Sequence, residues 1–540
     1  MIKKLRIALV QMNALVGDIE GNLTKHLEAI HYAQQKLKAN AIVFPELSLT
    51  GYPPEDLLFR KNFIQKTQEA LHTLKNHVKD IYCIVGHPNL TPQGLQNACS
   101  VIYQEKTLGR YAKQYLPNYG IFDENRYFTP GNDTCVIPIH GVSVGIIICE
   151  DLWHPLPIQQ AAAHGAQCII IPNASPFEIN KHEERTAILA ERAKTHRLPL
   201  CYVNCIGGQD ELLFDGGSMI VNEAGEICEN IGFFTESIHP VDMEFTHNQI
   251  HIEKKPLAIP TPIERIYQGL TLGVRDYVEK NHFSRVLLGL SGGIDSALTL
   301  AIAVDALGSD RVTAIIMPSR YTAEMSIEDA KILANNLGVR YEILSIEPSF
   351  TSFLDTLTPL FASKKPSITE ENIQSRCRAV LLMALSNARD ELLLATGNRS
   401  EFAVGYTTLY GDMAGALAVL KDVLKTQVYE LVAYRNYIHP AIPQRIIDRP
   451  PSAELAINQK DEDSLPPYPV LDKILWHYLN QEQSAEDIIS QGFSPEIVEK
   501  VITLIKNSEY KRRQAPPGIR VNHKAFGRDR RYPITSGFKG

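Results

Sequence analysis

The chain has 540 residues, of which 44% are hydrophobic and 21% charged, and its formal net charge is −7. This length predicts two or more domains, because a single hydrophobic core rarely organises so long a chain. The composition is that of a globular protein, no apolar run reaches the ~18–20 residues that cross a bilayer, and the negative charge argues against nucleic acid as the main partner.

The amino-terminal run MIKKLRIALVQMNALVGD has two lysines before a short apolar stretch. A polar helical pattern follows it, so we expect a first strand rather than a signal peptide. The nine cysteines include no C-x-x-C pair, which fits neither a disulfide framework nor a zinc site. A reducing, cytoplasmic location is the expectation.

Residues 1–250 alternate short β-rich runs with helical patterns, which predicts an α/β domain. A helix is expected at 22–38, where Leu23, Leu27 and Ile30 fall on one face after a capping region at Gly17-Asp18. The strand candidates are 6–11, 41–45, 82–86, 142–149, 168–172 and 199–204.

Three ionisable residues come at or beyond the ends of predicted strands, and the strand that ends at Lys113 is additional to these six. AIVFPELSLTGY contains Glu46, LGRYAKQYLPNYGIFDE contains Lys113, and VSVGIIICEDLWHP contains Cys149. Taken alone, Glu46 is compatible with a loop acid and Lys113 with a solvated strand end, and a cysteine such as Cys149 at the end of an apolar strand is more often a core residue. Together they would meet where open α/β sheets bind ligands.

The chemistry of the three groups fits an amidase. Cys149 would attack an amide as thiolate, Glu46 would carry the proton to the leaving ammonia, and Lys113 would stabilise the oxyanion. His154 follows a tryptophan and precedes a proline, so a papain-like pair is not favoured.

This Glu–Lys–Cys arrangement resembles the nitrilase, or carbon–nitrogen hydrolase, family over most of residues 1–250, which implies an α/β sandwich. The resemblance also implies a glutamine pocket formed by Tyr119, Ser175, Lys181 and Glu124, with Glu124 orienting Lys113. Ser175 as a turn residue and Lys181 as a surface charge remain the alternatives.

The stretch HIEKKPLAIPTPIE, residues 251–264, is proline-rich and is the predicted linker. A second α/β domain is expected over 265–540. Its strand candidates are 286–290, 312–317, 341–346 and 391–396. A loop at 449–468 interrupts this domain, and we expect it to be mobile or ordered by ligand.

The string VLLGLSGGIDSALTLAIA predicts a strand, a tight turn and a helix beginning near Ser296. Gly292 and Gly293 let backbone N–H groups approach a ligand, and the helix end favours an anion. Asp295 would repel phosphate unless a cation lies between them, so we expect Mg²⁺-pyrophosphate here, without the lysine of the familiar phosphate loop. An ordinary capped turn is the alternative.

SGGIDS resembles the pyrophosphate loop of the N-type ATP pyrophosphatases, which split ATP between its α- and β-phosphates and form a substrate adenylate. ENIQSRCR, LLATGNRSEFAVGYTTLYGDMAG, PPSAEL and DEDSLPPY resemble the NAD synthetases over most of 265–540. This implies an open parallel-sheet domain of the adenine nucleotide α-hydrolase-like type. Arg399 stands where the resemblance leads us to expect lysine.

The resemblance implies three sets of residues in this domain. Deamido-NAD would meet Asn372, Glu401 and Lys511, the last from a basic tail that is otherwise a solvated patch, and Mg²⁺ would be held by Asp295 and Glu401. The implied ATP contacts are Gly289, Leu290, Ser291, Gly292, Gly293, Ile294, Asp295, Ser296 and Thr396.

The two halves together resemble the glutamine-dependent NAD synthetases over nearly the whole chain. The first would release ammonia from glutamine, leaving glutamate. The second would use ATP and Mg²⁺ to amidate deamido-NAD, releasing AMP and pyrophosphate. A homo-oligomer, at least a dimer through the second domain, is implied, with no nucleic acid or membrane partner.

Several alternatives remain open from the sequence. A related ligase that aminates a nucleotide would share the loop, whereas an RNA-thiolating relative would be expected to show more basic charge or a redox cysteine pair. From other classes, the chain would be an amidase whose second half only senses nucleotides, or a non-catalytic scaffold.

Overall fold

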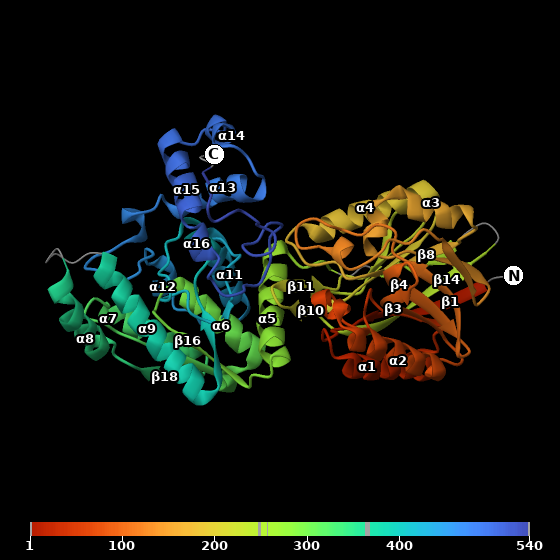
Figure 1. The fold of residues 1–540 in the computed structure, drawn as a ribbon, viewed down its shortest axis with the longest axis horizontal. Helices are drawn as coiled ribbons and strands as arrows, with labels where there is room; N and C mark the ends of the chain where they lie inside the picture. The colour runs from red at the N-terminus through yellow and green to blue at the C-terminus, as the bar shows by residue number, and fades with distance from the viewer. Residues whose placement is uncertain (1–2, 247–249, 256–257, 362–367, 538–540) are drawn as a thin grey trace. The chain divides into compact units, whose positions relative to one another are not determined.

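The computed structural model describes residues 3–246, 250–255, 258–361 and 368–537. The chain divides into two compact units, Met1–Pro260 and Thr261–Gly540 (Figure 1). The predicted linker, 251–264, includes this point of division, but β15 (Ile250–Ile252) extends into it and α5 (Pro262–Lys280) begins within it. Residues 256–257 of that stretch lie outside the described residues.

The first unit is a sandwich of two sheets, with α1 and α2 along one side and α3 and α4 along the other (Figure 1). The seven-stranded sheet has the order β15-β14-β1-β2-β3-β4-β5, and the six-stranded sheet β13-β12-β9-β8-β7-β6. The helices are α1 (Ile19–Tyr32), α2 (Lys61–His77), α3 (Pro155–Ala163) and α4 (Lys181–His196).

The strands of the first sheet are β1 (Lys3–Gln11), β2 (Ala41–Val43), β3 (Tyr82–Thr91), β4 (Gly94–Tyr103), β5 (Lys106–Ala112) and β14 (Ser237–Phe245), together with β15. Those of the second are β6 (Cys135–Ile139), β7 (Val142–Ile146), β8 (Cys168–Asn173), β9 (Leu200–Asn204), β12 (Met219–Val221) and β13 (Ile227–Asn230). A separate hairpin joins β10 (Ile206–Gln209) to β11 (Leu212–Asp215).

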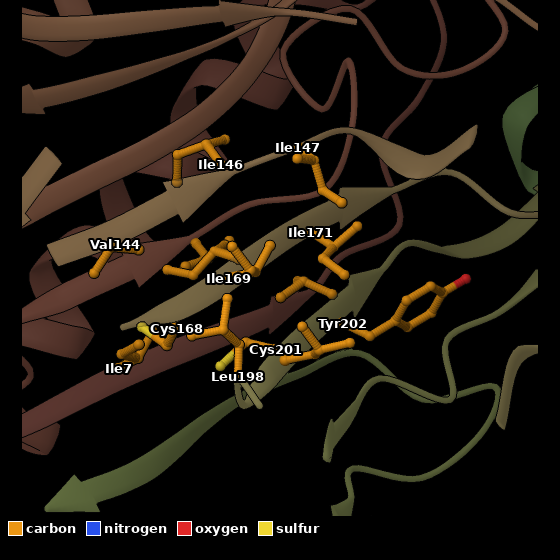
Figure 2. Close-up of a cluster of buried hydrophobic side chains, with 14 of the residues drawn as sticks. Ile7, Val144, Ile146, Ile147, Cys168, Ile169, Ile171, Leu198, Cys201 and Tyr202 are labelled. Atoms are coloured by element: carbon orange, nitrogen blue, oxygen red, sulfur yellow. The ribbon is translucent and has the colours of Figure 1, made fainter. Parts of the chain in front are cut away.

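Strand β1 shows how the sequence builds both layers of the core. Leu5, Ile7 and Leu9 belong to the cluster between the two sheets, part of which is drawn in Figure 2. Ala8 and Val10 point the other way and pack in the cluster that includes apolar residues of α1 and α2. Successive side chains of a strand point to opposite faces, so one β-rich segment serves both interfaces.

All six strands predicted in the first unit are present, with ends shifted by a few residues. The run predicted at 142–149 ends at Ile146, and Cys149 instead begins a short 3₁₀ turn, Cys149–Trp153. Helix α1 is capped by Asp18, whose side chain accepts from the N–H of Gly21, as the capping region predicted. Strands β4, β6 and β14, which pair antiparallel with β3, β7 and β1, were not predicted.

The second unit contains a five-stranded sheet of order β18-β17-β16-β19-β20, in which every neighbouring pair is parallel. Its strands are β16 (Arg285–Gly289), β17 (Val312–Ile316), β18 (Arg340–Ile343), β19 (Glu391–Ala395) and β20 (Leu417–Ala418). The four strands predicted from the sequence are therefore confirmed, and β20 is additional. Helix α6 (Ile294–Leu307) begins two residues before the expected Ser296.

The remaining helices of this unit flank the sheet or form a smaller apolar cluster near the carboxyl terminus. They are α7 (Glu324–Asn336), α8 (Glu347–Leu357), α9 (Ile368–Arg389), α10 (Arg399–Val404), α11 (Lys425–Ile438), α12 (Gln444–Asp448), α13 (Tyr468–Leu475), α14 (Ala485–Ser490), α15 (Pro495–Asn507) and α16 (Glu509–Arg512).

Candidate active sites

Two carboxylates and one ammonium meet inside the first unit. Glu46 follows β2, and Lys113 follows β5 directly. Lys113 Nζ donates hydrogen bonds of 2.7 Å to Glu46 Oε1 and 2.8 Å to Glu124 Oε1, and all three side chains are buried. Burial opposes the charge on Lys113, but Glu124 and Glu46 raise its pKa well above the ordinary value. The lysine is therefore a fixed cation.

Cys149 lies in the turn after β7, with a backbone φ of +45°. A side chain in this left-handed region is uncommon outside special sites. Burial raises the pKa of the Cys149 thiol well above its ordinary value, Glu46 raises it further, and Lys113 partly offsets both. The resting thiol is therefore neutral and needs a base before it can attack.

Two residues that the sequence did not single out complete this cluster. Asn97 Nδ2 donates to Glu46 Oε1 at 2.7 Å, and Tyr52 Oη donates to Glu124 Oε1 at 2.9 Å. Burial raises the pKa of Glu124 against the opposing charge of Lys113, and the charge on Glu46 adds to the rise. Asn97 lies on the unpredicted strand β4, so no motif indicated it.

Two of the side chains predicted for glutamine, Tyr119 and Lys181, contact the turn Cys149–Trp153. Tyr119 Oη donates to Glu150 Oε2 at 3.0 Å, and Glu150 directly follows Cys149 in the chain. Lys181 Nζ lies 4.5 Å from the ring centroid of Trp153, at the start of α4. Glu150 was not predicted, and it places a largely buried carboxylate beside the cysteine.

Ser175 is held by a buried polar network. Its N–H donates to Asn204 Oδ1 at 2.9 Å, and its Oγ accepts from Arg185 Nε at 3.1 Å. Arg185 also pairs with Asp215 at 2.7 Å. A buried arginine therefore fixes the hydroxyl of Ser175.

In the second unit, a cavity of about 290 Å³ lies at the phosphate loop. All eight predicted ATP residues of the loop line it, as does Thr396. Gly292 has φ +83°, and a Cβ there would lie 2.4 Å from the backbone oxygen of Ser326, so only glycine fits. Ser296 Oγ bonds Ser291 Oγ and the Gly293 carbonyl, both at 3.0 Å, which holds the turn against the start of α6.

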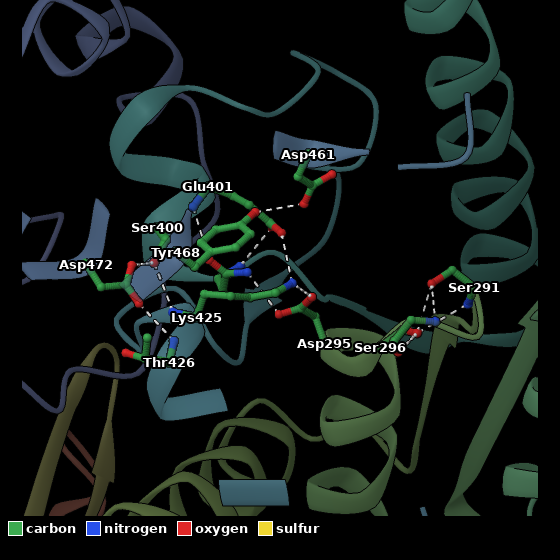
Figure 3. Close-up of polar contacts among 12 residues, drawn as sticks. Ser291, Asp295, Ser296, Ser400, Glu401, Lys425, Thr426, Asp461, Tyr468 and Asp472 are labelled. Atoms are coloured by element: carbon green, nitrogen blue, oxygen red, sulfur yellow. Dashed lines mark hydrogen bonds and ion pairs between the residues drawn. The ribbon is translucent and has the colours of Figure 1, made fainter. Parts of the chain in front are cut away.

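The two predicted metal ligands share one cation, Lys425, at the start of α11 (Figure 3). Lys425 Nζ donates to Asp295 Oδ2 and lies 3.6 Å from Glu401 Oε1. Asn398 Nδ2 donates to Asp295 Oδ1 at 2.9 Å. Burial opposes the charge on Lys425, whereas Asp295 and Glu401 raise its pKa. No sequence motif led to Lys425.

Within the described ranges, no three His, Cys, Asp or Glu side chains are grouped to hold a metal ion by themselves. The oxygen pair of Asp295 and Glu401 nevertheless fits Mg²⁺, which binds through one or two carboxylates and takes its other ligands from phosphate and water. The donor set suits a cation that arrives with a nucleotide.

The two other residues predicted for deamido-NAD meet one segment, residues 405–408. Asn372 Oδ1 accepts from Thr408 Oγ1 at 2.8 Å. Lys511 Nζ donates to the carbonyl oxygens of Gly405 and Thr407, each at 2.8 Å, and Thr407 lines the cavity. Both residues therefore lie beside the cavity but do not line it.

The loop predicted at 449–468 borders the same cavity through residues 449–455 and Asp461. Ser326 Oγ donates to Glu454 Oε1 at 2.7 Å, and Gln374 Nε2 donates to the Leu455 carbonyl at 2.9 Å. These bonds connect the loop to α7 and α9.

Arg399 is buried and does not line the cavity. Its guanidinium donates to Asp422 Oδ1 at 2.9 Å, Asn480 Oδ1 at 2.8 Å and the Lys524 carbonyl at 2.7 Å. A lysine has no comparable planar fork, so the arginine is explained by the partners around it.

Fold and sites together define a class of protein, the ligases in which an amide-hydrolysing unit is joined to an ATP-using unit. The carbon-nitrogen hydrolase family model matches residues 6–248, and the NAD synthase family model matches residues 266–515. Within the described ranges, no helix combines the length and apolarity needed to span a bilayer.

Curated relatives match the whole chain. The glutamine-dependent NAD(+) synthetase of Acinetobacter baylyi is 46% identical, covering 100% of this chain and 99% of the relative, and that of Thermotoga maritima is 41% identical, covering 100% of both. A solved structure of the glutamine-dependent NAD+ synthetase from Acinetobacter baumannii in complex with ADP is 44% identical, covers 98% of each chain and has a TM-score of 0.80. The chain belongs to the glutamine-dependent NAD(+) synthetases, and its two units are the nitrilase-like glutaminase domain and the NAD synthase domain.

Proposed function

We propose that Cys149, Glu46 and Lys113 hydrolyse glutamine in the first unit. Glu46 takes the proton of the neutral thiol as Cys149 Sγ attacks the side-chain amide carbon. Lys113 stabilises the tetrahedral oxyanion. The carbon–nitrogen bond then breaks, Glu46 returns the proton to the departing ammonia, and water cleaves the thioester to release glutamate. The observation that carries this assignment is the lysine held between Glu46 and Glu124 beside the nucleophile.

Glutamine carries an α-carboxylate and an α-ammonium group, so its binding site needs protein groups of both charges. Lys181 suits the α-carboxylate, and Glu150, which accepts from Tyr119, suits the α-ammonium. Ser175 lies next to the proposed base in the chain's contacts, because the N–H of Ala174, its neighbour, donates to Glu46 Oε2 at 3.0 Å. These residues would select glutamine over simple amides.

In the second unit, the phosphate loop and Thr396 hold ATP, while Asn372, Glu401 and Lys511 hold deamido-NAD. The nicotinate carboxylate attacks the α-phosphorus, pyrophosphate leaves, and an acyl adenylate forms. Ammonia then attacks the acyl carbon and AMP leaves. Mg²⁺ held by Asp295 and Glu401 would neutralise phosphate charge. Lys425 is placed to balance the carboxylates and to contact phosphate oxygens.

Ammonia passing directly between the two sites would avoid protonation in water, since excluding water suppresses side reactions. We also assign the enzyme to the cytoplasm and to a homo-oligomer that is at least a dimer. Both assignments rest on the family, and the cytoplasmic one also on nine buried cysteines that form no disulfide in the part of the chain that the structure describes.

The test is incubation of the purified chain with Mg-ATP, deamido-NAD and amide-¹⁵N glutamine, with Cys149→Ala in parallel on glutamine or ammonium. We expect ¹⁵N-labelled NAD from the parent and rescue of the variant by ammonium alone, read by mass spectrometry. AMP without NAD would move the acceptor elsewhere. Labelled NAD from the variant would remove Cys149 from the mechanism.

A further inference from the structure

Asp151, two residues after Cys149, is a fully buried carboxylate with four hydrogen-bond donors around it. Its Oδ1 accepts from the N–H groups of Gln114 at 3.1 Å and Tyr115 at 2.9 Å. Its Oδ2 accepts from the N–H of Ile148 at 3.1 Å and from Tyr111 Oη at 2.8 Å.

These donors flank two of the reacting groups. Gln114 and Tyr115 directly follow Lys113, and Ile148 directly precedes Cys149. Lys113 comes after β5, at the edge of the seven-stranded sheet, whereas Cys149 comes after β7 of the other sheet. The ladder hydrogen bonds within each sheet therefore do not set the distance between lysine and thiol.

We propose that Asp151 is a positioning residue for glutamine hydrolysis, whose carboxylate joins the chain after Lys113 to the chain before Cys149. The inference rests on the catalytic roles proposed above. A carboxylate accepts at both oxygens, so one side chain can hold both segments at once. The same four bonds stabilise the strained turn at Cys149, which explains why a buried charge is retained there.

Asp151→Asn is the direct test, because its NH₂ group must face N–H donors at one of the two segments. We expect kcat for glutamine hydrolysis to fall about 10²-fold, the order of loss that a misplacement of about 1 Å produces, with KM for glutamine nearly unchanged. Tyr111→Phe removes only the hydroxyl and keeps all three N–H contacts, so it should keep most of the parent kcat.

A second readout separates positioning from loss of folding. The charged groups acting on Cys149 include Glu46, Lys113 and Glu150, and the buried Arg185 also interacts with it. If Lys113 is displaced, its charge no longer lowers the pKa of the thiol, so the pH midpoint of Cys149 alkylation by iodoacetamide should move upward in Asp151→Asn. The alkylated peptide is measured by mass spectrometry, with Cys149→Ala as blank.

Pyrophosphate release from ATP and deamido-NAD by the second unit reports that the variant chain is intact. Parent-like kcat, or a reduced kcat with an unchanged alkylation midpoint, overturns the inference. If Asp151→Asn does not fold, Asp151→Glu replaces it, since one added methylene alters the spacing while keeping the charge; a parent-like kcat and midpoint there also overturn it. Loss of glutaminase activity in the parent would instead refute the proposed function.

Discussion

Lys113 donates a 2.7 Å hydrogen bond to Glu46, and the two residues are only 1% and 2% exposed. The proposed oxyanion stabiliser and the proposed base are therefore paired before substrate arrives. Lys113 keeps Glu46 beside a neutral thiol. Asn97 and the N–H of Ala174 donate further hydrogen bonds to the Glu46 carboxylate. This geometry leads to separate expectations for each group.

Glu46→Gln should remove the base while preserving the shape of the site. We expect kcat for glutamine hydrolysis to fall 10²–10⁴-fold, the typical contribution of general acid–base catalysis, measured as glutamate release. Adenylation of deamido-NAD by the second unit should continue, and this is the control for an intact chain. Glutamate release at the parent rate would show that another group takes the thiol proton.

Lys113→Met should destabilise the first unit as well as inactivate it. The change leaves Glu46 and Glu124 buried without their cation, and breaking a buried pair costs about 3–5 kcal/mol. Lys25→Met is the matched control, because its partner Glu236 is half exposed and such pairs contribute about 0–1 kcal/mol. Urea denaturation measures the free energy of unfolding of both variants. If both variants lose the same stability, burial of the ion pair is not the cause.

Gly292→Ala should disrupt ATP binding through a steric clash. The added Cβ would meet the Ser326 carbonyl at 2.4 Å, so the phosphate loop must shift. Gly308→Ala, at the other end of α6, is the matched control: its φ of +85° imposes similar strain, but nothing lies within 4 Å of its Cβ. Calorimetric titration with ATP should show weakened binding only for Gly292→Ala, and equal weakening would implicate backbone strain alone.

Asp295→Asn should raise the Mg²⁺ concentration that adenylation requires and lower its rate by about 10-fold or more, because one of the two proposed carboxylate ligands is lost. Mn²⁺ binding in the presence of ATP, followed by electron paramagnetic resonance, provides a readout besides activity. Asp305→Asn serves as control, since Asp305 lies on the same helix but pairs with Arg435 at 2.6 Å. Unchanged Mn²⁺ binding in Asp295→Asn would remove this residue from the metal site.

The rate of glutamine hydrolysis should decrease as the pH is lowered below neutrality. Burial raises the pKa of Asp151 to about 6, against the N–H groups of Tyr115 and Ile148, so acid protonates a carboxylate that must accept four hydrogen bonds. The effect on stability has the opposite sign. A folded pKa above the unfolded value of 3.8 means that the contribution of this group is present below about pH 4 and is lost as pH rises through 6.

Rate and melting profiles between pH 4 and 7 check both statements. The stability of the parent relative to Asp151→Asn should decrease across that window, because the variant lacks the titrating group. The rate of adenylation by the second unit should not show the pH dependence that Asp151 gives to glutamine hydrolysis. A glutaminase profile that is flat down to pH 5 would show that Asp151 remains ionised there.

Local sequence patterns predicted the two-unit α/β organisation, the parallel strands and the residues of the phosphate loop. Apolar strands followed by glycine-rich turns carry a local signal, because backbone freedom and helix capping depend on neighbouring residues. Cys149, Glu46 and Lys113 were found in the same way, each at or after a predicted strand. Strand β4 was missed, although it pairs antiparallel with β3 and β5, its neighbours in the chain.

Which distant charged groups pair with one another depends on how the chain folds and could not be predicted from its sequence. Lys425 lies between Asp295 and Glu401, although more than a hundred residues separate it from Asp295 in the chain. Asp151 joins segments that follow strands of different sheets. The physical reason is that buried charges and N–H groups must find partners once water is excluded, and those partners are set by packing rather than by spacing along the chain.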